Sequence, residues 1–204
     1  MTARRPLLIA VLAGLLAGAT SLLTACAGGP SATSAAAAST PAATAALPPI
    51  LFVHGNGDTA ALWTTTVWRF ESNGWPRDRL FAIDLPYPQA RDDDSKEQQG
   101  RSSTTEQRNQ LAAEIDRVLA AAGAPQLVLM GYSRGGYAIR NVLANVGGAS
   151  KKVSHVILGG TPNHGVWSLP NFRPTNEFNG AGPFLKALNA PKGADGQLLP
   201  EGSA

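Results

Sequence analysis

The chain has 204 residues, of which 17 are Lys or Arg and 14 are Asp or Glu, giving a net charge of +3. This length suits one domain with an appendage rather than two domains. With 15% charged and 44% apolar residues, most of the chain is expected to fold. The single cysteine excludes an internal disulfide framework and a multi-cysteine zinc site. The small net charge gives no basis for binding nucleic acid.

Residues 1–26 have the pattern of an export signal, because two arginines precede an uncharged run rich in Leu and Ala at residues 7–23. The run is about long enough to span a bilayer, so an uncleaved anchor helix is one alternative. Its end, Leu-Thr-Ala-Cys at residues 23–26, resembles the lipobox of bacterial lipoprotein signals. The resemblance implies that Cys26 is lipidated and becomes the mature N-terminus. Removal of the signal would take away both arginines and leave the mature chain with a net charge near +1.

Residues 27–49 consist almost entirely of Ala, Ser, Thr, Pro and Gly and carry no charge. Such a stretch has no apolar periodicity to bury, and it predicts a disordered tether. A short alanine-rich helix at residues 35–38 is the alternative, although nearby prolines would limit it. We expect the folded domain to occupy residues 50–204.

After residue 49, apolar strands alternate with helices. Short apolar runs predict buried strands at residues 50–53, 80–83, 126–130 and 153–158. Helical spacing predicts helices at residues 59–72, 105–122 and 135–146. This order indicates an α/β fold, with a parallel sheet between two layers of helices. Beyond residue 160 prolines interrupt the pattern, and only residues 183–188 suggest another helical turn or two.

The first predicted helix and the loop before residue 103 carry further predictions. In the first helix, Leu62, Val67 and Phe70 are spaced to face the core. The polar loop up to residue 103 carries three consecutive aspartates at residues 92–94. An acidic trio could bind a cation, but we expect a solvated loop.

The sequence Gly-Tyr-Ser-Arg-Gly at residues 131–135 lies between a predicted strand and a predicted helix. A G-x-S-x-G turn in this context is the pattern of a nucleophile elbow. Gly131 and Gly135 are the small neighbours that a strained turn needs, and Ser133 would stand above the sheet edge. The backbone N–H of Arg134 would donate to a developing oxyanion. The alternative is an ordinary serine in a glycine-rich turn.

A second motif, His-Gly-Asn-Gly at residues 54–57, follows the first predicted strand. Together the two motifs resemble the α/β-hydrolase fold, particularly small bacterial lipases and esterases. The resemblance implies that Asn56 supplies the second oxyanion donor through its backbone N–H. It implies that His54 and Gly55 shape this loop, and that His54 is not the catalytic base. It also implies that no metal or cofactor is needed.

A third segment, Gly-Gly-Thr-Pro-Asn-His-Gly at residues 159–165, resembles the Gly-Thr-Pro-x-x-Gly sequence that follows the corresponding strand in many lipases. In such enzymes an acid and then a histidine follow the serine, each after a further strand. Here no histidine follows His164, and no convincing pair of strands follows residue 160. We therefore expect a domain that is incomplete at its C-terminus, with the final strands and the triad acid and histidine beyond residue 204.

These motifs predict a serine hydrolase of carboxylic esters, lipase-like or esterase-like, with Ser133 as nucleophile and a small-molecule or lipid ester as substrate. Lipidation of Cys26 would hold it at the bacterial cell envelope, whereas plain signal cleavage would make it secreted. The alternative is a non-catalytic or inactive lipid-anchored binding protein of the same fold, which the missing histidine favours. Four aromatic residues are candidates for an acyl pocket, or for core or lid packing: Trp63, Tyr132, Trp167 and Phe172.

Overall fold

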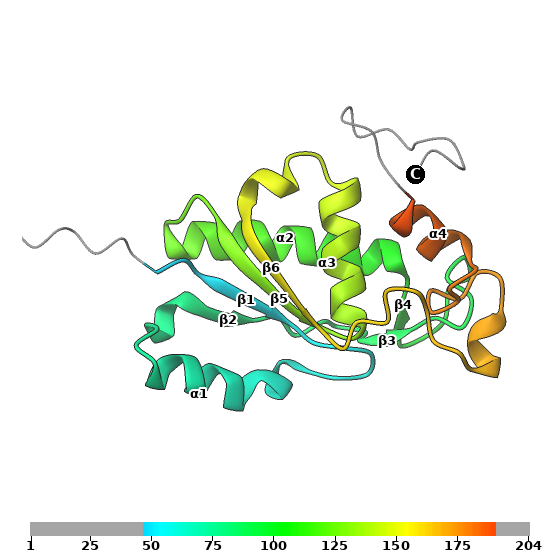
Figure 1. Ribbon diagram of the computed structural model, residues 1–204, viewed down its shortest axis with the longest axis horizontal. Helices are drawn as coiled ribbons and strands as arrows, with labels where there is room; N and C mark the ends of the chain where they lie inside the picture. The colour runs from blue at the N-terminus through cyan, green and yellow to red at the C-terminus, as the bar shows by residue number, and fades with distance from the viewer. Residues whose placement is uncertain (1–46, 191–204) are drawn as a thin grey trace, which may run out of the picture. The chain divides into compact units, whose positions relative to one another are not determined.

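The computed structural model describes residues 47–190, in which helices cover a parallel sheet (Figure 1). The strands are β1 (Ile50–Val53), β2 (Leu80–Ala82), β3 (Gln89–Ala90), β4 (Arg101–Ser102), β5 (Leu127–Tyr132) and β6 (Val153–Gly159). The α-helices are α1 (Thr64–Ser72), α2 (Thr104–Ala122), α3 (Arg134–Asn145) and α4 (Pro183–Asn189). Short 3₁₀ helices are Ala60–Trp63, Arg77–Arg79, Ala149–Lys152 and Leu169–Phe172. The predicted signal with Cys26, nearly all of the tether, and residues 191–204 lie outside the described residues.

The main sheet has the order β2-β1-β5-β6, and its neighbouring strands are all parallel. Helix α1 covers one face, and α2 and α3 cover the other (Figure 1). The predicted three-layer α/β architecture is therefore confirmed. All four predicted strands are present within a residue or two of the expected bounds.

The continuous apolar run of β1 is explained by burial on both of its faces. Leu51 and Val53 pack in the cluster under α2 and α3, whereas Ile50 and Phe52 pack in the cluster under α1. Successive side chains of a strand point to opposite faces, so both sets must be apolar. Full burial of each such side chain contributes about 1.5–3 kcal/mol.

The first helix differs from its predicted facing. Leu62 is 41% exposed, and Trp63 is buried in its place, with its ring 5.2 Å from that of Phe52. The expectation for Leu62 was wrong because Leu62 lies five residues before Val67, whereas Trp63, Val67 and Phe70 have the i, i+4, i+7 spacing of one helix face. Val67 is buried and Phe70 packs against the same cluster, as expected.

The predicted loop before residue 103 is more ordered than expected, since β3 and β4 form a small parallel sheet within it. Asp93 and Asp94 of this loop accept hydrogen bonds from other residues of the chain. The Thr175 hydroxyl donates to Asp93 at 2.6 Å, and the backbone N–H and hydroxyl of Thr104 both donate to Asp94 at 2.7 Å. Among residues 47–190, no group of three or more His, Cys, Asp or Glu is placed to hold a metal ion.

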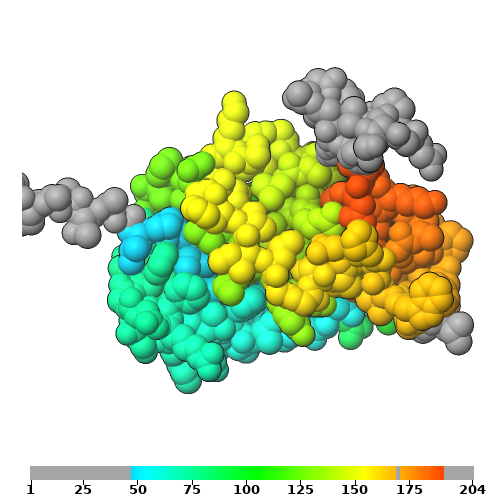
Figure 2. Space-filling view, viewed as in Figure 1, coloured from blue at the N-terminus to red at the C-terminus, as the bar shows by residue number. Residues whose placement is uncertain are grey.

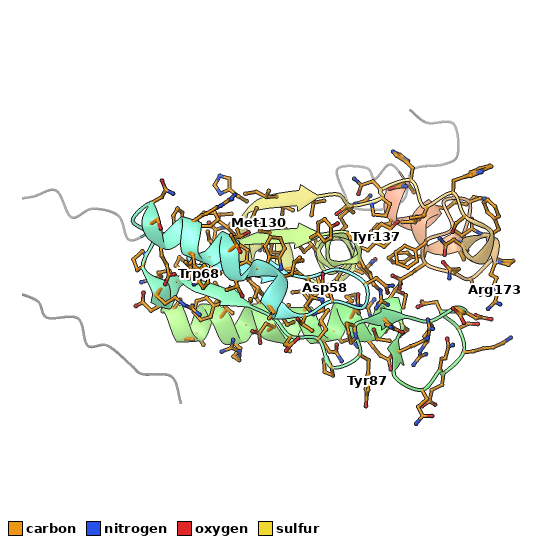
Figure 3. All side chains as sticks on the ribbon, turned by 90° about the horizontal axis from the view of Figure 1, so that it is seen from below. Asp58, Trp68, Tyr87, Met130, Tyr137 and Arg173 are labelled. Carbon is orange, nitrogen blue, oxygen red and sulfur yellow. The ribbon has the colours of Figure 1, made fainter. Side chains whose placement is uncertain are left out.

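Residues 161–190 pack on α3, although their sequence shows little periodicity. The ring of Tyr137 lies 5.7 Å from that of Phe178 and 5.8 Å from that of Phe184. Figure 3 shows Tyr137 between the sheet and this last part of the described chain. Its hydroxyl donates to the Pro162 carbonyl, and burial raises the pKa of Tyr137. No helix within the described range is both long and apolar enough to cross a membrane.

Candidate active site

Three loops meet at one edge of the sheet because their strands are parallel and in register. Val53 at the end of β1 is opposite Gly131 of β5, and Tyr132 is opposite Gly159 of β6. The loops after β1, β5 and β6 therefore begin side by side, at the carboxyl ends where open α/β sheets bind ligands. The Ser133 N–H donates to the Gly159 carbonyl at 3.0 Å, which ties two of these loops together.

Ser133 has φ 51° and ψ −121°, and it is the one non-glycine residue with positive φ in the part of the chain that the structure describes. This conformation costs a non-glycine residue about 1–3 kcal/mol, and it persists where the surrounding structure enforces it. Helix α3 begins at the next residue, and the Gly136 N–H donates to the Ser133 carbonyl at 3.0 Å. The strand, the strained serine and the helix have the geometry of a nucleophile elbow.

Glycines surround this serine because neighbouring atoms leave no room for side chains. A Cβ atom on Gly131 would lie 2.6 Å from Ile139 Cδ1, and one on Gly135 would lie 2.4 Å from the Val53 carbonyl oxygen. On Gly55 it would lie 3.0 Å from the Cβ of Ser133 itself. The start of α3 thus packs directly on the end of β1, and the loop after β1 packs on the serine.

His54 is completely buried, and both of its ring nitrogens are engaged. The Leu85 N–H donates to Nε2 at 3.1 Å, and Nδ1 lies 2.9 Å from the Gly55 carbonyl oxygen, to which it donates. This pattern fits the neutral ring, with the proton on Nδ1. His54 therefore links the end of β1 to the segment after β2, and it has no free nitrogen to take a proton from Ser133.

Of the two predicted oxyanion donors, Arg134 is the first residue of α3, and Asn56 lies on a loop that two hydrogen bonds hold. The side-chain oxygen of Asn56 accepts from the Ala90 N–H at 2.7 Å, and the Gly57 N–H donates to the Pro88 carbonyl at 3.1 Å. The backbone N–H groups of Asn56 and Arg134 donate to no other described residue. Both are thus free to donate to a ligand, and their oxyanion role stays a prediction.

Among residues 47–190, no histidine makes a hydrogen bond to the Ser133 hydroxyl. His155 on β6 and His164 on the following loop are both exposed. The candidate pocket aromatics are also dispersed: Trp63 belongs to the core below α1, whereas Trp167 is 92% exposed and contacts Phe172 edge to face. They do not line one acyl pocket.

A model of the alpha/beta hydrolase fold matches residues 48–187. The chain belongs to the α/β hydrolase family. None of the curated proteins compared with this α/β hydrolase matches it. Among solved structures, lipase BlEst2 of Bacillus licheniformis in its mature form is 28% identical, with a TM-score of 0.44 over 59% of this chain and 43% of that one.

Two further structures give similar values. A monoacylglycerol lipase of Paleococcus ferrophilus is 17% identical, with a TM-score of 0.45 over 61% of this chain and 44% of that one. A cutinase of Trichoderma reesei, bound to a phosphonate inhibitor, is 24% identical, with a TM-score of 0.40 over 65% of this chain and 57% of that one. This α/β hydrolase chain spans less than half the length of the two lipases that it matches.

The side chain of Arg134 is the feature of this α/β hydrolase site that sequence reasoning missed. It is completely buried and forms a bidentate ion pair with the buried carboxylate of Glu177. Burial raises the pKa of Glu177, and the adjacent Arg134 guanidinium opposes that rise by favouring the carboxylate. The sequence carries no signal for this pair, because arginine side chains are mostly exposed and are fully buried almost only when they are paired.

Proposed function

We propose that this α/β hydrolase domain is part of a serine hydrolase that cleaves carboxylic esters, with Ser133 as the nucleophile. The observation that carries the proposal is the positive φ of Ser133 at the junction of β5 and α3. A structural serine gains nothing from that strained conformation, whereas a nucleophile does, because the turn exposes its hydroxyl at the sheet edge.

The proposed chemistry is an acyl transfer in two steps. The Ser133 oxygen attacks the ester carbonyl carbon, and a general base takes the hydroxyl proton. The carbonyl oxygen becomes an oxyanion, which the N–H groups of Asn56 and Arg134 hold. The bond to the alcohol oxygen then breaks and the alcohol leaves with the proton. Water, activated in the same way, releases the acid and restores Ser133.

The two backbone N–H groups support this chemistry because neither donates to another residue of the described range. Arg134 directly follows the nucleophile, and Asn56 lies on the loop after β1, whose end is opposite Gly131 of β5. In other hydrolases, removal of one such donor lowers kcat by about 10²–10³. A small-molecule or lipid ester is the substrate class that the sequence resemblance implies.

The test is hydrolysis of a short-chain nitrophenyl ester by the purified chain, with labelling of Ser133 by a fluorophosphonate followed by mass spectrometry. We expect Ser133→Ala to abolish labelling and to lower turnover by at least about 10⁴-fold. Ser72→Ala is the matched control, because that hydroxyl only caps the end of α1 by donating to the Trp68 carbonyl.

Two outcomes would change the interpretation. Turnover that survives Ser133→Ala would reject Ser133 as the nucleophile. Folded protein that neither labels nor turns over would favour the non-catalytic binding protein. If serine-dependent turnover is found, His164 is the first candidate base to replace, since it is exposed on the loop after β6.

We also infer that the protein is exported and anchored to the bacterial cell envelope by acyl chains on Cys26. Support comes from the Leu-Thr-Ala-Cys sequence and the uncharged tether that follows it. Each buried CH₂ contributes about 0.8 kcal/mol, so two or more chains anchor a protein stably. Metabolic labelling with an alkyne fatty acid in a bacterial host should mark the native chain and leave Cys26→Ser unmarked. Equal labelling of both would reject the anchor.

A further inference from the structure

All five N–H donors of the buried Arg134 side chain have acceptors, which is the maximum that a guanidinium can use. Nε and Nη2 donate to the two carboxylate oxygens of Glu177 at 2.5 and 2.7 Å. Nη2 also donates to the Ser102 carbonyl at 2.7 Å. Nη1 donates to the Ser102 hydroxyl and to the Pro88 carbonyl, both at 3.0 Å. The residue next to the nucleophile is therefore fixed from three separate segments.

Pro88 connects this guanidinium to the other predicted oxyanion donor. Its carbonyl accepts from Arg134 Nη1 and also from the Gly57 N–H at 3.1 Å. Two residues further on, the Ala90 N–H donates to the side chain of Asn56 at 2.7 Å. The loop of Asn56 and the side chain of Arg134 are thus attached to the same short segment before and within β3.

A buried ion pair is poor evidence of a purely stabilising role. Taking two charges out of water costs much of what their attraction returns, and well-packed apolar residues often stabilise as well. A guanidinium whose five N–H groups all donate contributes geometric specificity, because its planar donors are satisfied by only one arrangement of partners. Geometry is also what an oxyanion site requires, since small displacements of a donor reduce the rate strongly.

The geometry points to Arg134 and Glu177 as a positioning pair, which fixes the backbone N–H groups of Arg134 and Asn56 relative to each other. The identity of these groups as oxyanion donors rests on the proposed function. Glu177 lies 43 residues after Arg134 in the chain and acts through the guanidinium. Its own segment is fixed by Thr175, whose hydroxyl donates to Asp93, and by Asn176, whose amide donates to the Asp92 carbonyl.

Arg140 offers a matched control on the same helix. It donates to the side chains of Asn163 and Asn189 and to the Leu188 carbonyl, so it also attaches the last part of the described chain to α3. None of these partners belongs to the loop after β1 or to the segment at Pro88. Its loss should loosen the packing of that last part without moving the elbow.

The experiment measures the backbone amide resonances of Asn56 and Arg134 by NMR in the purified chain, together with kcat and KM for a nitrophenyl ester. We expect Glu177→Gln to shift both amide resonances and to lower kcat by about 10- to 100-fold. KM should stay within about twofold, because the acyl and alcohol parts of the substrate do not touch the pair. Arg134→Lys should lower kcat as well, although it keeps the positive charge, since an ammonium cannot replace the planar guanidinium with its five donors.

Arg140→Met should lower the thermal midpoint and leave the Asn56 and Arg134 amide resonances and kcat unchanged. If Glu177→Gln fails to fold, the double variant Arg134→Met/Glu177→Met replaces both charges at once and should fold, with the Asn56 amide resonance displaced. Unchanged resonances in a folded variant would overturn the positioning role. A wild-type chain that does not turn over esters would reject the proposed function, while the resonances would still decide the role of the pair.

Discussion

Ser133 and its glycine neighbours show how much of this site is decided by contacts of single atoms. Gly135 is required because the carbonyl oxygens of Val53 and His54 lie 2.4 and 2.5 Å from where its Cβ would be. These are backbone atoms of a buried strand end, so they cannot move aside as a flexible side chain can. The serine conformation and the approach of α3 to β1 therefore depend on each other.

Gly135→Ala should lower the free energy of unfolding by about 1–3 kcal/mol, because the added methyl group overpacks the start of α3. Gly147→Ala is the matched control: its Cβ would meet no atom within 4 Å, and its φ is not positive. There we expect no change or a small gain, since alanine restricts the unfolded chain. Urea unfolding followed by circular dichroism measures both, and equal stabilities of the two variants would contradict the packing argument.

At the scale of elements, local sequence determined where most helices begin and end. Helix α2 starts with a capping box, in which the Ser103 hydroxyl accepts from the Glu106 N–H and the Glu106 carboxylate accepts from the Ser103 N–H at 2.7 Å. Gly123 ends it with φ 57°, a left-handed conformation that favours glycine. In the 3₁₀ helix Ala60–Trp63 that precedes α1, by contrast, Trp63 is buried and Leu62 is exposed.

The capping box makes α2 sensitive to pH through Glu106. Its pKa is lowered, first by the hydrogen bond from the Ser103 N–H, so the stability that it contributes is present above its unfolded pKa of 4.5. That contribution is lost as the pH falls through the lower pKa of the folded state. Glu106→Gln should therefore cost about 0.3–1 kcal/mol at pH 7, the usual value of an anion at a helix N-terminus.

At pH 3 the difference between wild type and Glu106→Gln should be smaller, which urea unfolding at the two pH values measures. Glu97→Gln, at an exposed carboxylate of the preceding loop, controls for the loss of one negative charge. A difference that grows as the pH falls would contradict the sign of the argument.

At the scale of the whole described domain, the sheet is covered unevenly. Strand β1 lies between β2 and β5 and is buried on both faces, whereas β6 is an edge strand with Val156 39% exposed and Ile157 47% exposed. Figure 2 shows residues 150–165, in yellow, lying open on the face toward the viewer. An exposed edge with branched apolar side chains is a template for pairing with another chain.

The purified chain should therefore self-associate, with an average mass that rises with concentration in sedimentation or light-scattering measurements. Ile157→Lys should reduce this association, because a charge on an edge strand opposes pairing. The variant should unfold at nearly the wild-type urea concentration, since the replaced side chain is half exposed. A wild-type monomer at all concentrations would show that this edge does not pair.

The order of strands and helices, the layers and the elbow motif could be predicted from the sequence because they depend on neighbouring residues. Residues 127–129 of β5 are all apolar because both faces of the strand are buried there, and the glycines beside Ser133 lie within two residues of it. The tertiary structure was needed to show that Arg134 pairs with Glu177, that Thr175 donates to Asp93, and that residues 161–190 pack on α3. The partners of Arg134 and Thr175 are 43 and 82 positions away in the chain, and which partners meet depends on how whole elements pack.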